Sequence, residues 1–292
     1  MAFGPFFLLA LMEGMVTAAV LALTAVGLSL VFGVMRVVNV AHGAFFMLGA
    51  VIAWYVTQAL PGHEVWGFIA ALIVAPLTVG CIALVADRAV ISRIHYEPEA
   101  TIVATIGLLY IFEQGALSLF GPNAQAVSAP FTLRIQLPWF GYSGYKLFVI
   151  CAAAAILLAI WALVMRSKAG LIMRATQIDR EMAQAFGINV NQVYATTFAF
   201  GAALAAIAAV LVVPIQQAHY LMGGDPLLLS FIVVILGGLG SLRGTIIAAI
   251  LVGLGDGVMS MLTTPTLAKI IATLLVAMVL VFRPQGLFGA KT

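Results

Sequence analysis

The stretch "FLLALMEGMVTAAVLALTAVGLSLVFG", residues 7–33, decides the class of this protein. It holds a single charged residue, Glu13. An α-helix needs about 20 mainly apolar residues to cross a hydrocarbon core about 30 Å thick. The stretch is therefore predicted to span a membrane as a helix.

The rest of the chain repeats this pattern. Its 292 residues are 64% hydrophobic and 8% charged, with a mean hydropathy of +1.19. Backbone in lipid must satisfy its own hydrogen bonds, which helices do within one segment. We expect an all-α polytopic membrane protein with one transmembrane domain, 1–292, and eight or nine spans, since some runs have the length of half-spans. The apolar runs cover residues 7–33, 42–59, 66–86, 101–120, 144–166, 193–213, 226–240, 244–262 and 266–282.

The basic residues are divided unevenly between the two sides that these spans create. The loops of one side hold ten of the thirteen Lys and Arg residues, and the other side holds three. Cytoplasmic loops carry an excess of Lys and Arg. The N-terminus is therefore predicted outside and the C-terminus in the cytoplasm, with residues 121–143 outside and residues 167–192 inside.

The longest polar interval, residues 166–193, lies on the predicted cytoplasmic side. Asp179 can cap a short helix that runs to residue 186, and Gly187 is a natural stop. At helical spacing, one face of this helix is apolar and the other is polar. The apolar face consists of Ile178, Met182, Ala185 and Phe186, and the polar face of Asp179, Arg180 and Gln184. On these residues alone, the helix either lies on lipid headgroups or fills a groove on a partner protein.

Sequence motifs of enzymes are missing. The chain has no GxxxxGK[ST] phosphate loop, no HExxH and no GxSxG. The run "GGLGSLRG", residues 237–244, looks like a nucleotide-binding turn but follows an apolar span and has no βαβ context. Cys81 and Cys151 lie inside apolar runs and are interpreted as small buried hydrophobes. We therefore expect no catalytic residue, no metal and no cofactor bound by this chain itself.

Four stretches, in this order, carry a resemblance to a known family. They are "VFGVMRVVNVAHGAFFMLGA" (31–50), "DREMAQAFGINVNQV" (179–193), "VVILGGLGSLRGTIIAAILVG" (233–253) and "FRPQGLFG" (282–289). They resemble the permeases of bacterial ATP-driven importers of branched-chain amino acids, and specifically the H-type permease subunit of the Liv family. The resemblance runs over nearly the whole chain. Permeases for urea and short amides share these motifs, so the resemblance leaves that alternative substrate open.

The resemblance implies an importer of the bacterial inner membrane built from several chains. A second homologous permease would share the translocation path, a periplasmic binding protein would deliver the substrate, and two cytoplasmic ATPases would bind ATP and Mg²⁺. It also implies that the loop helix docks into an ATPase groove, since Glu181, Ala183 and Gly187 match the coupling-loop pattern ExAxxxG. The implied coupling residues are Asp179, Arg180, Glu181, Met182, Ala183, Phe186 and Gly187. The rival functions are a secondary transporter or channel that acts alone, and a purely structural membrane subunit.

Three carboxylates lie within the predicted spans. Because an ionised carboxylate at membrane depth is costly, Glu13, Glu113 and Asp256 are expected to face the bundle interior or water. There they contact a substrate ammonium, or they bond neighbouring helices or lie at the membrane interface. Of the three, Glu113 is the one we expect to face the interior.

Two turns hold further candidates for the path. Asn39, His42 and Gly43 lie between the first two predicted spans, where they either line the path or fix the turn. Glycines allow close helix approach and helix breaks, and broken helices create polar surface at membrane depth. The second turn contains Gly237, Gly238, Gly240 and Ser241.

Overall fold

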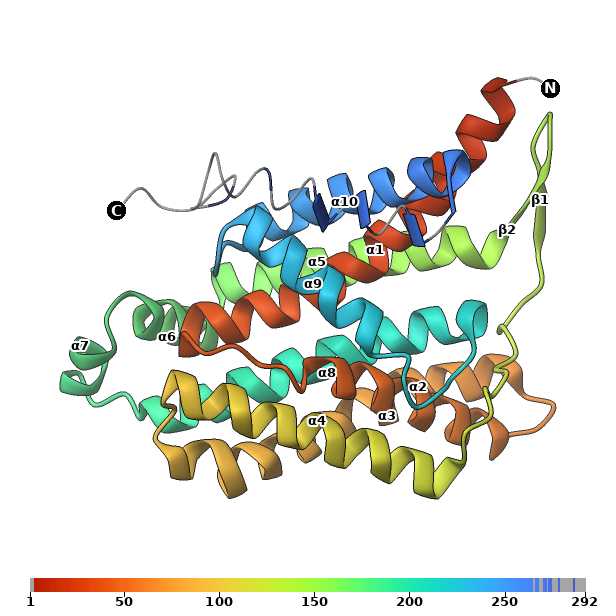
Figure 1. Cartoon of the computed structure of the whole chain (residues 1–292). Coiled ribbons are helices and arrows are strands. Elements are labelled where there is room, and N and C mark those ends of the chain that lie inside the picture. The colour runs from red at the N-terminus through yellow and green to blue at the C-terminus, as the bar shows by residue number, and fades with distance from the viewer. Residues whose placement is uncertain are drawn as a thin grey trace.

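The computed structural model describes residues 3–264 and, beyond them, residues 266–267, 270–271, 273–274, 278 and 286. Long helices run side by side, with a β-hairpin at one end of the bundle and two short helices at the other (Figure 1). The elements are α1 (Phe3–Met35), α2 (His42–Gln58), α3 (Glu64–Ala86), a π-helical turn (Asp87–Ile91), a 3₁₀ turn (Ser92–Ile94), α4 (Pro98–Phe120), β1 (Arg134–Gln136), β2 (Gly141–Ser143), α5 (Gly144–Arg166), α6 (Lys168–Ile178), α7 (Arg180–Ala185), α8 (Val190–Gln216), α9 (Gly224–Gly237) and α10 (Leu242–Leu262).

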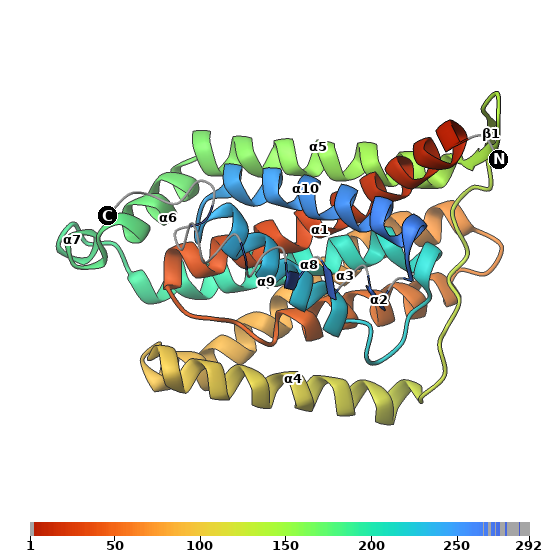
Figure 2. The same ribbon diagram turned by 45° about the horizontal axis from the view of Figure 1, so that its top comes forward.

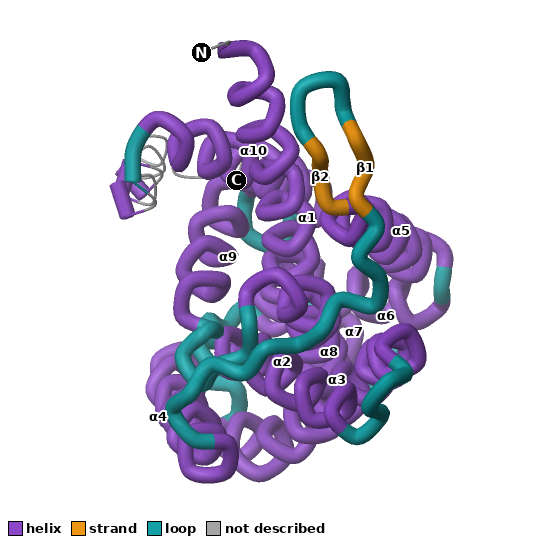
Figure 3. Tube along the Cα trace, turned by 90° about the vertical axis from the view of Figure 1, so that its right-hand side faces the viewer, coloured by secondary structure: helices purple, strands orange, loops and turns teal. Residues whose placement is uncertain are grey.

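Helices α1 and α8 form the middle of the bundle. Burial inside the chain covers 89% of the most apolar stretch of α1 and 67% of that of α8, against 22 to 33% in α3, α4, α5 and α10. In Figures 2 and 3, α1 lies between α10, α5 and α8. The outer helices therefore direct most of their apolar side chains away from the chain, toward lipid or a partner.

Small residues bring the central helices close together. A Cβ added to Gly49 on α2 would lie 2.5 Å from the Cα of Ala206 on α8, and one added to Gly253 on α10 would meet the backbone of Ala18 on α1. Lipid supplies no hydrophobic drive between helices, so close van der Waals packing at small residues holds them together.

Among the described residues, six helices are long and apolar enough to cross a membrane: α1, α3 with the two turns that continue it, α4, α5, α8 and α10. The runs predicted at 42–59 and 226–240 form shorter helices, α2 with 17 residues and α9 with 14. A helix of 14 residues is about 21 Å long, less than the hydrocarbon thickness of about 30 Å. The all-α polytopic class is confirmed, with fewer full-length spans than the eight or nine expected. The expected ninth span, 266–282, falls mostly outside the described residues.

The first turn reaches deeper than the sequence suggested. After α1 ends, Arg36 has a left-handed backbone (φ 55°), and the chain runs back along α1 without helical structure until α2 begins at His42. The His42 Nε2 atom lies 2.9 Å from the carbonyl oxygen of Thr24, eleven residues before the end of α1 at Met35. Eleven residues of helix correspond to about 16 Å. His42 therefore lies level with the middle of α1 and not at its end.

Helix α9 begins beside the start of α2. The carbonyl oxygen of Gly223 would lie 2.7 Å from a Cβ added to Gly43, so the two backbone segments touch where both short helices start. From there α9 runs to Gly237, where a glycine turn leads into α10. Non-helical backbone at membrane depth is tolerated where protein buries it, as it does here.

The two ends of the bundle differ. The β1–β2 hairpin lies at one end and α6 and α7 at the other, so residues 121–143 and 167–192 are on opposite sides (Figure 1). Both cysteines were expected to be buried, which is wrong: Cys81 on α3 and Cys151 on α5 are exposed. The reason is physical, because the outward face of a membrane helix is as apolar as its buried face.

Candidate functional site

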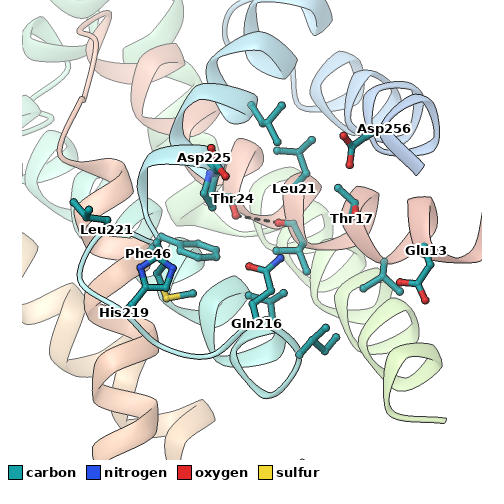
Figure 4. Close-up of a pocket in the computed structure, with 17 residues that line it drawn as sticks. Glu13, Thr17, Leu21, Thr24, Phe46, Gln216, His219, Leu221, Asp225 and Asp256 are labelled. Atoms are coloured by element: carbon teal, nitrogen blue, oxygen red, sulfur yellow. Dashed lines mark hydrogen bonds between the residues drawn. The ribbon is translucent and has the colours of Figure 1, made fainter. Parts of the chain in front are cut away.

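A cavity of about 290 Å³ lies between α1, α9, α10 and the segment that joins α8 to α9; we call it the α9 cavity. Figure 4 shows that its polar side chains come from different parts of the chain. Its carboxylates are Glu13, Asp225 and Asp256. Its other polar residues are Thr17, Thr24, Gln216 and His219.

Three separate helices bring the carboxylates to the α9 cavity. Glu13 lies on α1, Asp225 in the first turn of α9 and Asp256 on α10. An acidic side chain in the first turn of a helix is stabilised by the positive end of the helix dipole, which explains the place of Asp225. Carboxylates at membrane depth mark substrate pathways or helix contacts. The cavity can therefore attract a cationic group.

The same cavity has apolar walls. They include Val20, Leu21, Phe46, Val212 and Leu229. A site with a few polar groups among apolar side chains is typical of pockets for small molecules. The cavity thus suits a small ligand with a cationic part and an aliphatic part.

An ion pair lies at the hairpin end of the cavity. The Nζ atom of Lys146 on α5 is 2.6 Å from one carboxylate oxygen of Glu13 and 2.8 Å from the other. The Lys146 ammonium also lies 5.8 Å from the ring centre of Tyr142 on β2. Burial and, secondly, the negative charge of Glu13 raise the pKa of Tyr142 well above its ordinary value. The Tyr142 hydroxyl is therefore neutral and leaves the pair's charges balanced.

His42 shapes the cavity without lining it. Because a carbonyl only accepts, its Nε2 atom donates to the carbonyl oxygen of Thr24, whose side chain lines the cavity. One turn along α2, Phe46 also lines the cavity. His42 is fully buried, and within the described residues its Nδ1 atom and the side-chain amide of Asn39 have no hydrogen-bond partner. The hydrogen bond of His42 and the close contact of Gly43 with Gly223 favour a structural role for these two residues in the turn, whereas the described contacts assign no role to Asn39.

The remaining membrane candidates lie elsewhere. Glu113 is buried on α4 but is not among the residues of the α9 cavity. Gly237, Gly238, Gly240 and Ser241 form the turn from α9 to α10, at the end of the bundle that carries α6 and α7. There, Ser241 caps α10 by accepting from the backbone N–H of Gly244 at 3.2 Å. Sequence reasoning missed Asp225, Gln216 and His219, which lie just outside the predicted spans.

The polar loop forms two helices where one was predicted. Ser167 caps α6 by accepting from the N–H of Gly170 at 3.0 Å, a start that the sequence analysis missed. Asp179 caps α7 by accepting from the N–H of Met182 at 3.0 Å, as predicted. Gly187 follows α7 with a φ of 81°, a conformation that suits glycine and ends the helix.

The apolar face predicted for this loop is exposed. Exposed fractions reach 80% for Ile178, 54% for Met182 and 81% for Phe186. With Ala185, which is also exposed, we call these residues the docking stripe; Ile178 ends α6, and the other three lie on α7 and at its C-terminal end. Large apolar side chains gathered on a surface indicate contact with a protein or a membrane.

The other predicted coupling residues of the loop divide into two groups. Ala183 is buried, and the Arg180 guanidinium lies 5.6 Å from the ring centre of Tyr194 on α8. These two residues hold α7 against the bundle. Glu181 is exposed in the first turn of α7.

No group of three or more His, Cys, Asp or Glu residues is arranged to hold a metal ion in the described part of the chain.

Comparisons with known proteins agree with this architecture. The family described as branched-chain amino acid transport system, permease component, matches residues 10–282. The high-affinity branched-chain amino acid transport system permease protein BraD of Pseudomonas aeruginosa is 29% identical over 96% of this chain and 94% of its own length. LivH of Escherichia coli K12 is 27% identical over 97% and 96%, and a probable LivH of Methanocaldococcus jannaschii 25% identical over 96% and 92%. No solved structure matches this chain. The full-length match, the multi-pass helical fold and the internal cavity lead to one conclusion: the chain belongs to the family of permease components of branched-chain amino acid transport systems.

Proposed function

We propose that this chain is the permease subunit of an ATP-driven importer of branched-chain amino acids in a bacterial inner membrane. The observation that carries the proposal is the family match over residues 10–282. A second homologous permease completes the translocation path, and a periplasmic binding protein delivers the substrate. Two cytoplasmic ATPases bind ATP and Mg²⁺ and hydrolyse the ATP, so this chain is not itself the enzyme.

The exposed docking stripe supports a partner on the loop. Phe186 and Ile178 are about four-fifths exposed, although each would gain about 1.5–3 kcal/mol from full burial. An amphipathic helix that lays its apolar face into a protein groove gains this energy. We assign that groove to the ATPase subunit.

The α9 cavity supports an amino acid as the substrate. Its carboxylates suit an α-ammonium group, and its walls of Val, Leu and Phe suit a branched aliphatic side chain. The relatives named above are described as branched-chain amino acid permeases, which points the same way. Urea and short amides, the alternative substrates, lack the cationic group that such a site would bind, and urea also lacks an aliphatic part.

Transport into proteoliposomes tests the function. The complex of this chain with its proposed partner permease, ATPases and binding protein should accumulate labelled leucine, isoleucine and valine when ATP is enclosed with the ATPases. Uptake of urea or acetamide in place of these amino acids would overturn the substrate proposal. Uptake by this chain alone, without ATPases, would favour the secondary transporter.

We further propose that the N-terminus lies in the periplasm and the C-terminus in the cytoplasm. A cysteine introduced at Ser128 or at Gln184, both exposed, tests this orientation in a background that lacks Cys81 and Cys151. An impermeant thiol reagent added to intact cells should label Ser128→Cys and spare Gln184→Cys. The reverse pattern would show the opposite orientation.

A further inference from the structure

Gln177 lies where three parts of the chain meet. It is near the end of α6 and directly precedes Ile178, the first residue of the docking stripe. Its backbone carbonyl accepts from the Nη2 atom of Arg36, just beyond the end of α1, at 3.3 Å. Its side-chain Nε2 atom donates to the carbonyl oxygen of Gly240, in the turn between α9 and α10, at 3.4 Å. One residue therefore connects the loop to α1 and to the α9–α10 turn.

Two glycines make room for the Gln177 amide. A Cβ added to Gly33 would lie 3.2 Å from the Gln177 Nε2 atom and 3.0 Å from the Cα of Gly240. A Cβ added to Gly240 would lie 2.9 Å from both the Nε2 atom and the Cα of Gly33, and the φ of Gly240 is 78°. The backbones of α1 and the turn thus approach each other closely, and the Gln177 amide lies against both.

The helix that carries Gln177 is firmly attached to α5. Arg174, one turn earlier, donates from Nη2 to the carbonyl oxygen of Met165 and from Nε to that of Gly170, each at 3.3 Å. A Cβ added to Gly170 would overlap the backbone of Val164, so α5 and α6 meet in a tight elbow. The start of α6 is therefore fixed to α5 by hydrogen bonds and close packing.

Space remains beside Gln177 for movement. A second cavity of about 220 Å³ lies there, with Gln177, Gly33, Gly240, Arg174, Ser241 and Arg243 among its lining residues. Packed interiors change between discrete arrangements, and such a change needs room for the moving side chain. The weak hydrogen bond of 3.4 Å between Gln177 and Gly240 can break at low cost.

The partners of Gln177 lead directly to the α9 cavity. Helix α1 runs from the Gln177 contact to Thr24 and Glu13, and α9 runs from the glycine turn to Leu229 and Asp225. Energetic coupling between distant sites is carried by contiguous contacts and rigid elements. Two helices therefore connect Gln177 with the wall of the cavity.

We propose that Gln177 is the positioning residue that couples the ATPase-docking loop to the α9 cavity through α1 and the α9–α10 turn. The proposal rests on the proposed function and assigns the path of communication within this chain. Through its hydrogen bond to Gly240, the amide of Gln177 makes the α9–α10 turn move together with the docked loop. Without that amide, the ATPases still bind, but the substrate-loaded binding protein stimulates their ATP hydrolysis less.

Gln177→Met tests the proposal in the complete reconstituted complex. Methionine keeps the length and helix preference of glutamine, removes the donor to Gly240 and leaves the backbone contact with Arg36 intact. ATPase retention and basal ATP hydrolysis should match those of wild type. Stimulation of hydrolysis by the substrate-loaded binding protein should fall about twofold, the factor that corresponds to the loss of one weak hydrogen bond. Leucine uptake should fall with it.

Gln184→Met is the matched control, because Gln184 is exposed and lies on the face of α7 opposite the docking stripe. It should behave as wild type. Gln177→Glu, which replaces the donor by an acceptor facing the Gly240 carbonyl, should lose at least as much stimulation as Gln177→Met.

Three results would overturn the inference. If Gln177→Met keeps full stimulation in a complex whose wild type is stimulated, Gln177 does not couple the two sites. If the variant loses its ATPases or fails to assemble, its role is structural. A wild-type complex that no loaded binding protein stimulates would instead contradict the proposed function itself.

Discussion

The α9 cavity and the docking stripe each place side chains in surroundings of the opposite polarity. In the cavity, carboxylates are gathered inside an apolar bundle, where they are costly unless they have a partner. In the stripe, large apolar side chains are held out from a polar loop, where they gain nothing unless they are covered. In each region, the side chains differ in polarity from what surrounds them. The cavity places charge among apolar walls, and the stripe leaves apolar surface uncovered.

The substitution Phe186→Asp should give the largest effect and affect the stripe alone. It removes an apolar contact of about 1.5–3 kcal/mol and adds the cost of desolvating a carboxylate. Each 1.4 kcal/mol weakens binding about tenfold, so ATPase binding should weaken by at least about tenfold. Co-purification of the ATPases and hydrolysis by the reconstituted complex measure this change.

Gln184→Ala is the control for Phe186→Asp and should keep the ATPases bound. Pairing with the second permease should persist in both variants, because the spans are unchanged. Normal ATPase retention by Phe186→Asp would show that the stripe lies on lipid headgroups instead.

Asp225→Asn should affect the cavity and spare the stripe. A hydrogen bond to a charged group is worth about 1.4 kcal/mol more than one to a neutral group, so the KM for leucine uptake should rise about tenfold. ATPase retention should be unchanged. Glu64→Gln, at an exposed acidic residue in the first turn of α3, is the matched control and should leave the KM unaltered. A rise in KM for both variants would contradict a specific role of the cavity in leucine transport.

His42→Ala should reduce uptake severalfold through the cavity's shape. The change removes the hydrogen bond to Thr24 and leaves space at the start of α2, which costs about 1–3 kcal/mol of stability. Arg36→Lys should cost less, because lysine keeps a donor near the carbonyl of Gln177. Uptake at matched membrane levels and thermal unfolding of the purified chain compare the two. Equal uptake by His42→Ala and wild type would limit His42 to the turn.

Lys146→Met should have the smallest effect. The side chains of Lys146 and Glu13 are 25% and 42% exposed, and an exposed ion pair contributes at most about 1 kcal/mol. Stability should therefore change little, as measured by thermal unfolding. A large loss of uptake without loss of stability would show that the charge of Glu13 must be neutralised for the cavity to work.

Sequence reasoning predicted the loop better than the membrane core. The Asp179 cap, the Gly187 stop and the apolar stripe follow from local rules that hold in any surroundings. In the spans, apolar residues occur on every face, so the helical period no longer tells inside from outside. For that reason Cys81 and Cys151 were placed wrongly. Glu113 is buried, as expected, but it does not line the cavity.

The two shorter helices, α2 and α9, were harder to foresee from the sequence. Hydropathy marks the run at 42–59 as apolar, but it cannot show that His42 returns to the level of Thr24 before the helix starts. That depth depends on the pairing of Gly43 with Gly223, residues far apart in the sequence. Asp225 was missed for a related reason, since it precedes the predicted span 226–240 by one residue and gains its role only when α9 meets α1.

The segment between α8 and α9 is joined to the loop before β1 by a reciprocal pair of backbone hydrogen bonds. The N–H of Gln125 donates to the carbonyl of Ala218 at 2.7 Å, and the N–H of Ala218 donates back at 2.8 Å. Ala218 stands between Gln216 and His219, which line the cavity. Because this clamp uses peptide groups alone, the rim can keep its shape while the side chains at both positions vary.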